Sequence, residues 1–323
     1  MHVRHTIRRR RQIRHMFEYA TSDLLNQGHT PGGLQPSSTR TKIGEVNELA
    51  LTNERRDELA TLLADEQRLR REYPKVADYL DMAPQLQGTG DERVDAAFDL
   101  RIIHYMTADL PIGSNPYWDI VAPFVFEHEG RRVVNGGQAA GSSRLSYAAM
   151  LLQAAYAYAI PSPETLEWVS TESAGRPLIE LGSGRGYWAA QLAQRGLKIE
   201  AYDFEPPHAT NNPSFPSAQG QRDEWHQVRT MEEFQQQHQD QENTILFLCW
   251  PPGWGNEMAS DSLHAFEKAG GAEMIYVGEP KGGKTANDQF FDLLSKNWTL
   301  RSQDANFVSW WNLKDTAQFW TKS

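Results

Sequence analysis

After residue 176 the chain alternates between short apolar runs and amphipathic segments with helical spacing. Apolar runs bounded by turn residues indicate buried strands, whereas apolar positions three and four apart indicate helices. This pattern predicts strands over 177–181, 198–203, 243–249 and 272–278, and helices near 187–195, 256–269 and 287–296. Because regular alternation is typical of α/β proteins, we expect a mainly parallel sheet with helices on both faces.

The first half of the chain carries a helical pattern instead. Leucines at helical spacing predict a helix from Asn53 to Tyr73, ended by Pro74. Further helices are expected over 91–106, 143–158 and 163–169, around an aromatic, glycine-containing stretch between 111 and 141. Near the end of the chain, the apolar runs 298–301 and 307–311 are expected to form a terminal antiparallel pair.

These patterns divide the chain into three expected parts. Residues 1–47 form a basic arm and an irregular linker, residues 48–170 a helical cap or substrate domain, and residues 171–323 a Rossmann-like, ligand-binding domain. The first 15 residues hold six arginines and no acid, although the net charge of the chain is -10. A basic arm can bind nucleic acid, but no basic face follows it, so we favour a solvated or internally paired extension.

Composition narrows the class of protein. The 323 residues are 39% hydrophobic and 23% charged, which fits a globular protein with ample length for a buried core. No apolar run is long enough for a membrane span. A single cysteine, Cys249, excludes an intrachain disulfide and fits a reducing compartment, so we expect a cytoplasmic protein. The histidines lack ligand spacing, so we expect no metal site.

The most informative stretch is Pro177–Trp188, an apolar run that ends in an acid and is followed by alternate glycines. The acid is Glu180, the glycines are Gly182, Gly184 and Gly186, and the next apolar run closes with Asp203. Strand, glycine-rich turn, helix, strand and acid is the order of a nucleotide-binding βαβ unit. Glycines let a ligand approach the backbone closely, and the final acid can accept both ribose hydroxyls.

The glycine spacing decides between nucleotides. Dinucleotide folds use G-x-G-x-x-G, and phosphate loops place Lys and Ser/Thr after the last glycine; neither pattern is present. The pattern E-x-G-x-G-x-G resembles motif I of the class I S-adenosylmethionine-dependent methyltransferases, whose ligand has ribose and adenine but no phosphate. Further segments within 156–323 resemble one poorly characterised group of that family: Tyr158–Pro161, Gly184–Ala189, Leu246–Pro252 and Ile275–Glu279.

The resemblance implies S-adenosylmethionine as cofactor and names the residues that would hold it. The glutamate and the glycines would line its methionine and ribose portions, Asp203 would hold the ribose, and Phe204 would flank the adenine. Ligands of open α/β sheets bind at the carboxyl ends of the strands, which agrees with these positions. The expected cofactor-binding residues are therefore Glu180, Gly182, Gly184, Gly186, Asp203 and Phe204.

The segment Trp250-Pro-Pro-Gly-Trp254 falls where enzymes that methylate amino groups of nucleic acids carry a polar residue followed by Pro-Pro and an aromatic. In those enzymes the polar residue accepts hydrogen bonds from the target amine, whereas the indole of Trp250 can only donate. We therefore expect no nucleic-acid substrate. The two tryptophans either stiffen a turn or line a substrate pocket, where an indole face can attract the sulfonium.

Three functions remain open from the sequence. The leading one is methyl transfer from S-adenosylmethionine to a small molecule. The second is intramolecular cyclisation of S-adenosylmethionine to azetidine-2-carboxylate and methylthioadenosine, as in cyclases that resemble class I methyltransferases. The third is binding without catalysis. Candidate catalytic residues are Tyr187, Asn135, Ser214 and Trp250, which supply neutral polar groups and aromatic faces.

Overall fold

The computed structural model describes residues 49–111, 113–208, 215–237 and 240–323. The arginine-rich arm, the whole of the expected linker and the candidate catalytic residue Ser214 lie outside the described residues.

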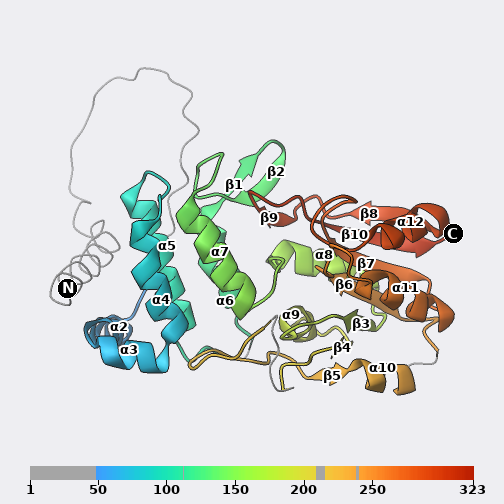
Figure 1. Ribbon diagram of the computed structural model, residues 1–323, viewed down its shortest axis with the longest axis horizontal. Helices are drawn as coiled ribbons and strands as arrows, with labels where there is room; N and C mark the ends of the chain where they lie inside the picture. The colour runs from blue at the N-terminus through green and yellow to red at the C-terminus, as the bar shows by residue number, and fades with distance from the viewer. Residues whose placement is uncertain (1–48, 112, 209–214, 238–239) are drawn as a thin grey trace.

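Helices dominate the described chain before residue 176 (Figure 1). The elements are α2 (Asn53–Ala64), α3 (Glu66–Glu72), α4 (Pro74–Met82), η2 (Ala83–Gln85), α5 (Glu92–Met106), α6 (Pro116–Val121), η3 (Ala122–Phe124), α7 (Ser143–Ala155) and α8 (Pro163–Ser173). The single helix expected over 53–73 is wrong in one respect, because it is divided at Asp65, whose side chain caps α3 by accepting the Arg68 N–H. The helical run ends before Pro74, as expected, and Pro74 then begins α4, which suits a residue without an N–H.

A small sheet interrupts these helices. Strands β1 (Val125–His128) and β2 (Arg131–Val134) form an antiparallel hairpin within the aromatic stretch. The third strand, β9 (Val308–Trp310), comes from the end of the chain and pairs with β2 in parallel. The expected pairing of 298–301 with 307–311 is therefore wrong, because the second of these runs joins the small sheet.

The main sheet has seven strands in the order β5 (Val228–Thr230), β4 (Ile199–Asp203), β3 (Leu178–Leu181), β6 (Ile245–Cys249), β7 (Glu273–Gly278), β10 (Thr316–Lys322) and β8 (Trp298–Gln303). The first five are parallel, and β10 runs antiparallel to both of its neighbours. The sheet is therefore mainly parallel and Rossmann-like, in agreement with the alternation of strands and helices along the sequence.

Helices cover both faces of this sheet. They are α8, α9 (Tyr187–Gln194), α10 (Met231–Gln237), α11 (Met258–Lys268) and α12 (Asp288–Asn297). Ile245 and Phe247 of β6 pack in one apolar cluster with residues of α8 and α9. The alternate residues, Leu246 and Leu248, pack with α10, α11 and α12. The continuous apolar run of β6 thus follows from burial on both sides.

A third apolar cluster joins the helical region to the Rossmann-like part. It contains residues of α4, α5, α6 and α7 together with Tyr187 of α9 and Trp310 of β9. The expected division at residue 170 stays a prediction, but chain from both sides of that position builds this cluster and the small sheet.

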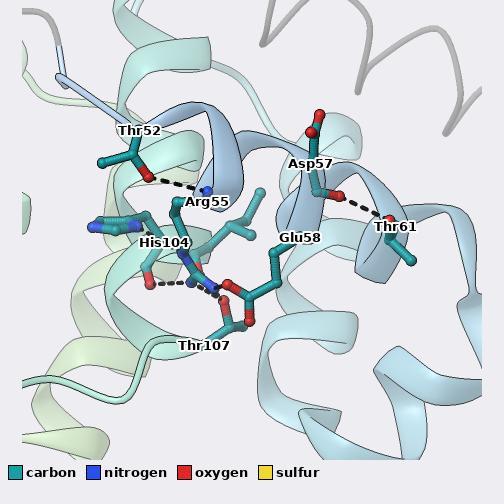
Figure 2. A network of polar contacts seen from close by, with 8 residues as sticks. Thr52, Arg55, Asp57, Glu58, Thr61, His104 and Thr107 are labelled. Atoms are coloured by element: carbon teal, nitrogen blue, oxygen red, sulfur yellow. Dashed lines mark hydrogen bonds and ion pairs between the residues drawn. The ribbon is translucent and has the colours of Figure 1, made fainter.

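A polar network fixes α2 against the end of α5 (Figure 2). The guanidinium of Arg55 donates to Nδ1 of His104 over 3.1 Å, to the His104 carbonyl over 2.8 Å and to Thr107 Oγ1 over 2.8 Å. Its remaining partner is Glu58, at 2.6 Å. Because Nδ1 accepts a hydrogen bond here, the imidazole is neutral in the folded protein. Burial, with the positive charges of Arg55 and Arg101, lowers the pKa of His104 to about 4.

We expect acid to weaken this contact. A histidine in the unfolded chain takes up its proton near pH 6.5, whereas folded His104 resists protonation down to about pH 4. The stabilising contribution is therefore present above about pH 6.5 and is lost as the pH falls towards 4. Replacing His104 by Asn keeps an acceptor near the Nδ1 position and removes the titration.

Denaturant unfolding at pH 7.5 and pH 5 measures this effect. The wild type should lose more unfolding free energy between these pH values than His104→Asn does. Equal losses of unfolding free energy in the two proteins would contradict the lowered pKa of His104.

Candidate functional site

A cavity of about 1080 Å³ lies where the strand order reverses, beside the carboxyl ends of β3 and β6. Such reversals leave a crevice in which α/β proteins bind ligands. The wall combines the glycine turn after β3, the end of β4, the loop after β6, the start of α11 and one face of α7. The residues that line it include Met150, Gln153, Tyr158, Glu180, Gly182, Ser183, Gly184, Asp203, Phe204, Phe215, Trp250, Trp254 and Met258.

The glycine turn needs its glycines for backbone conformation. Gly182, Gly184 and Gly186 have φ angles of 79°, 54° and 69°, in the left-handed region that other residues rarely adopt. A Cβ on Gly182 would lie 2.0 Å from the Met258 methyl carbon, and one on Gly184 would lie 2.7 Å from the ring of Phe215. Gly182 and Gly184 line the cavity, whereas Gly186 caps α9 and lies outside its lining.

Asp203 ties the end of β4 to the glycine turn. Its Oδ2 accepts the Gly184 N–H over 2.7 Å, and its Oδ1 accepts the Glu205 N–H over 2.8 Å. Each carboxylate oxygen can accept a second hydrogen bond, so the group can still bind two ligand hydroxyls. Burial raises the pKa of Asp203 above its usual value. Phe204, with 58% of its surface exposed, lies at the mouth of the cavity.

Glu180 is the most perturbed acid in the cavity wall. It is 2% exposed, and its Oε2 has no hydrogen-bond partner. Burial raises its pKa to about 8, because a buried carboxylate loses the water that stabilises its charge. The Oγ of neighbouring Ser183 is also buried without a partner. Orphaned polar atoms in a cavity wall indicate a ligand that carries the missing donors.

Trp250 and Trp254 both adopt the left-handed backbone region, with φ angles of 53° and 50°. Such conformations strain a bulky residue by about 1–3 kcal/mol and tend to mark functional turns. The indole nitrogen of Trp250 donates to Oδ2 of buried Asp315 over 2.9 Å, which fixes the ring in the cavity wall. Trp254 is 84% exposed at the cavity edge.

Two candidate catalytic residues lie outside the cavity lining. Tyr187 is fully buried; its hydroxyl donates to Oδ1 of Asn115 over 2.8 Å and accepts the Tyr117 N–H over 3.1 Å. The hydroxyl thereby anchors α6 to α9, and the ring does not line the cavity. Asn135 follows β2, where its Oδ1 accepts the Gly137 N–H over 2.9 Å as part of a turn. Neither side chain touches the cavity.

Sequence reasoning missed most of the aromatic and helical wall. Tyr158 stacks on Trp250 with ring centroids 5.4 Å apart and an interplanar angle of 10°. Phe215 meets Tyr158 edge to face at 6.0 Å. The segment 158–161 carries part of the family resemblance, which was a usable signal for Tyr158. Nothing in the sequence indicates that Phe215 lies against the glycine turn in the folded chain.

Arg185, between the second and third glycines, assembles this site although it does not line it. The guanidinium is 1% exposed and donates to the carbonyls of Ala154 over 3.0 Å and Pro216 over 2.9 Å. A third hydrogen bond reaches the carbonyl of Asp223 over 3.1 Å, and its carboxylate lies equally close. The side chain thereby joins the glycine turn, the end of α7 and the loop that carries Phe215.

Two features are absent from the part of the chain that the structure describes. No group of three or more metal-ligating side chains is clustered there. Over the same residues, no helix combines the length and apolarity needed to cross a membrane.

No protein-family model and no curated protein matches the chain. Among solved structures, magnesium protoporphyrin IX methyltransferase (ChlM) from Synechocystis PCC 6803 with bound SAH is 12% identical, over 49% of this chain and 80% of that one, with a TM-score of 0.31. The same enzyme with bound SAM is 10% identical over 50% and 80%, with a TM-score of 0.29. A structure described as "Conversion of a Disulfide Bond into a Thioacetal Group during Echinomycin Biosynthesis" is 14% identical over 48% and 79%, with a TM-score of 0.28. Similarities this low establish no family for the chain.

We expect Tyr187→Phe to destabilise the protein without affecting ligand binding. The substitution keeps the ring and leaves the buried Tyr117 N–H without its acceptor, so unfolding should become easier by about 1–3 kcal/mol. Tyr147→Phe is a matched control, since that ring is partly exposed and stacked on Tyr79. Chemical denaturation measures the difference. Unchanged stability together with weakened ligand binding would instead show that Tyr187 acts in the ligand-binding site.

Proposed function

We propose that the cavity binds S-adenosylmethionine and that the protein is a methyltransferase acting on a small molecule. The observation that carries this proposal is the arrangement around Glu180. Its unpartnered Oε2 lies in the wall of a cavity bounded by an E-x-G-x-G-x-G turn and by an acid at the end of the next strand. A cationic ligand with a ribose and no phosphate suits this set of groups.

Each group has a distinct role in the proposal. Asp203 accepts hydrogen bonds from the ribose hydroxyls, and the backbone at Gly182 and Gly184 admits the ligand at close range. Glu180 lies near the positively charged end, where a neighbouring cation favours its ionised form. Phe204, exposed beside Asp203, covers the adenine.

In methyl transfer, the main task of the protein is to position the two reactants. S-adenosylmethionine supplies a methyl group on a sulfonium; the acceptor's lone pair bonds to that carbon while the sulfur keeps the electron pair of the broken bond. Holding the acceptor in line supplies much of the acceleration. The fixed ring of Trp250 and the wall of α7 are the surfaces of this chain that would orient the acceptor.

Two rival functions receive less support. Cyclisation of S-adenosylmethionine needs neutral polar groups that orient the ligand's own amine. Of the polar candidates Tyr187, Asn135 and Ser214, the first two lie outside the cavity lining. Binding without catalysis does not explain the strained backbone at the two tryptophans.

We expect Asp203→Ala to weaken binding of S-adenosylmethionine by at least about tenfold. The substitution removes two charge-assisted hydrogen bonds to the ribose, each worth roughly 1.5–3 kcal/mol. Titration calorimetry measures the affinity, and Asp203→Asn should fall between wild type and Ala because its amide oxygen still accepts.

Thermal melting without ligand controls for a disturbed turn, since Asp203 also binds Gly184. Wild-type affinity in Asp203→Ala would contradict the ribose assignment. The same samples should contain no methylthioadenosine by mass spectrometry, and its accumulation at turnover rates would favour cyclisation.

We also expect binding to release a proton. The pKa of Glu180 is raised to about 8 by burial, so the acid is largely protonated at pH 7 in the free protein. A bound sulfonium and ammonium favour the carboxylate, so affinity should rise as the pH increases from 6.5 to 8. Calorimetry in phosphate and in Tris, whose ionisation enthalpies differ, detects the released proton. Glu180→Gln should give the same binding heat in both buffers, and a wild type that does so would contradict this role.

A further inference from the structure

Large apolar side chains that face solvent are concentrated around the cavity. Among the described residues they are Met82, Met150, Tyr158, Phe204, Trp254 and Leu300, and four of these six line it. Single exposed apolar residues need no explanation, but a cluster at the rim of a cavity marks a binding surface. Phe204 belongs to the proposed cofactor end, which leaves Met150, Tyr158 and Trp254 without a role.

We call the part of the wall to which these three residues belong the apolar end of the cavity; Phe215, which contacts Tyr158, connects it to the glycine turn. Met150 and Gln153 come from α7, and Tyr158 follows that helix. The α7 face in the cavity consists of Ser146, Ala149, Met150 and Gln153, so it carries no charge. Every carboxylate in the lining comes instead from the strand ends after β3 and β4 or from the start of α11. The apolar end is therefore suited to a molecule other than the cationic cofactor.

The aromatic rings at this end are already arranged as a stack. Tyr158 lies nearly parallel to Trp250, and Phe215 meets Tyr158 at an angle of 74°. These rings come from three separate segments of the chain. The hydrogen bond from Trp250 to Asp315 prevents the innermost ring from turning. A rigid stack with an exposed outer member, Tyr158 at 39%, presents a flat surface on which another ring can stack.

The backbone at Trp254 gives independent support. An indole that is 84% exposed gains little from packing, yet its residue adopts a strained left-handed conformation. The segment that leads into the turn is held by residues 285–286, because the Ala286 N–H donates to the Pro251 carbonyl over 3.0 Å and Pro252 forms a bridge with Thr285. A held, strained turn that keeps an indole in solvent is explained by a ligand that covers the indole.

We propose that this end of the cavity is the acceptor subsite and that it takes a flat, uncharged aromatic molecule stacked on Tyr158 and covered by Trp254. The proposal rests on the function proposed above, since the subsite adjoins the cofactor end. Met150 borders this subsite. The α7 face carries no charge, so it tolerates a hydroxyl or a ring nitrogen on the acceptor.

Two probes of the same carbon skeleton test the subsite. The protein is first titrated with S-adenosylhomocysteine and then, saturated with it, with 2-naphthol and with decahydro-2-naphthol. Burial of apolar area alone does not favour 2-naphthol, because the saturated probe has the same carbon skeleton and, with its added hydrogens, at least as much apolar surface. Stacking requires the flat ring, so we expect 2-naphthol to bind at least about tenfold more tightly.

Variants then test where 2-naphthol binds. Tyr158→Leu should bring the two probes within about twofold of each other, since it keeps apolar bulk and removes the stacking face. Trp254→Ala, at a position that is 84% exposed, should weaken 2-naphthol binding without altering the melting temperature. Leu300→Ala is the control: it removes an exposed apolar side chain on β8, outside the cavity lining, and should change neither affinity.

The outcomes separate the two proposals. Failure of S-adenosylhomocysteine to bind would overturn the proposed function and the subsite together. Normal S-adenosylhomocysteine binding without a preference for 2-naphthol would overturn the subsite alone. A preference that survives both Tyr158→Leu and Trp254→Ala would also overturn it, because the flat probe would then bind elsewhere.

Discussion

The guanidinium of Arg185 is the contact on which the shape of the cavity depends. A buried arginine is stable only when its N–H groups find acceptors, and here carbonyls from residues 154, 216 and 223 provide them. Those carbonyls belong to the end of α7 and to the loop after β4. The glycine turn can therefore adopt its position only together with the walls that face it. The guanidinium also lies 5.6 Å from the ring of Phe215, which places an aromatic wall beside the turn.

The second constraint is the backbone after β6. Strain in this turn is sustained by hydrogen bonds from outside it: the Trp250 N–H donates to the Val277 carbonyl over 2.7 Å, and its indole donates to Asp315. Asp315 itself is buried and also accepts a hydrogen bond from Ser309 at the end of the small sheet. The position of Trp250 is thus set by chain that follows β9, more than fifty residues later. This dependence explains why the small sheet, remote in sequence, contributes to the site.

The sequence indicated β3, β4, β6 and β7 well because each is a short, largely apolar run buried in the sheet, a local signal. It did not indicate β5, which has three residues, or β10, in which buried and partly exposed residues alternate. The glycine motif and Asp203 were equally visible, since φ angles near +60° restrict those positions to glycine and the acid ends a strand. The sequence did not indicate the contacts of Tyr187, because the direction of a side chain in the first turn of a helix depends on what packs there, and its partner Asn115 is seventy-two residues away. β9 was misplaced because a three-residue strand takes its partner from tertiary structure alone. Tyr158 and Phe215 meet only after folding, so no spacing in the sequence connects them.

Charge gives the proposed cofactor end its selectivity. Glu205, Glu257 and Asp261 are exposed at the mouth, so water screens them and they discriminate weakly between ligands. Glu180 is shielded from water, and burial raises its pKa to about 8, which means that its anion is destabilised until a positive charge arrives. A sulfonium satisfies that requirement better than the neutral thioether that remains after methyl transfer. Under the proposed function, Glu180 would therefore hold the reactant more tightly than the product and favour release once the methyl group has left.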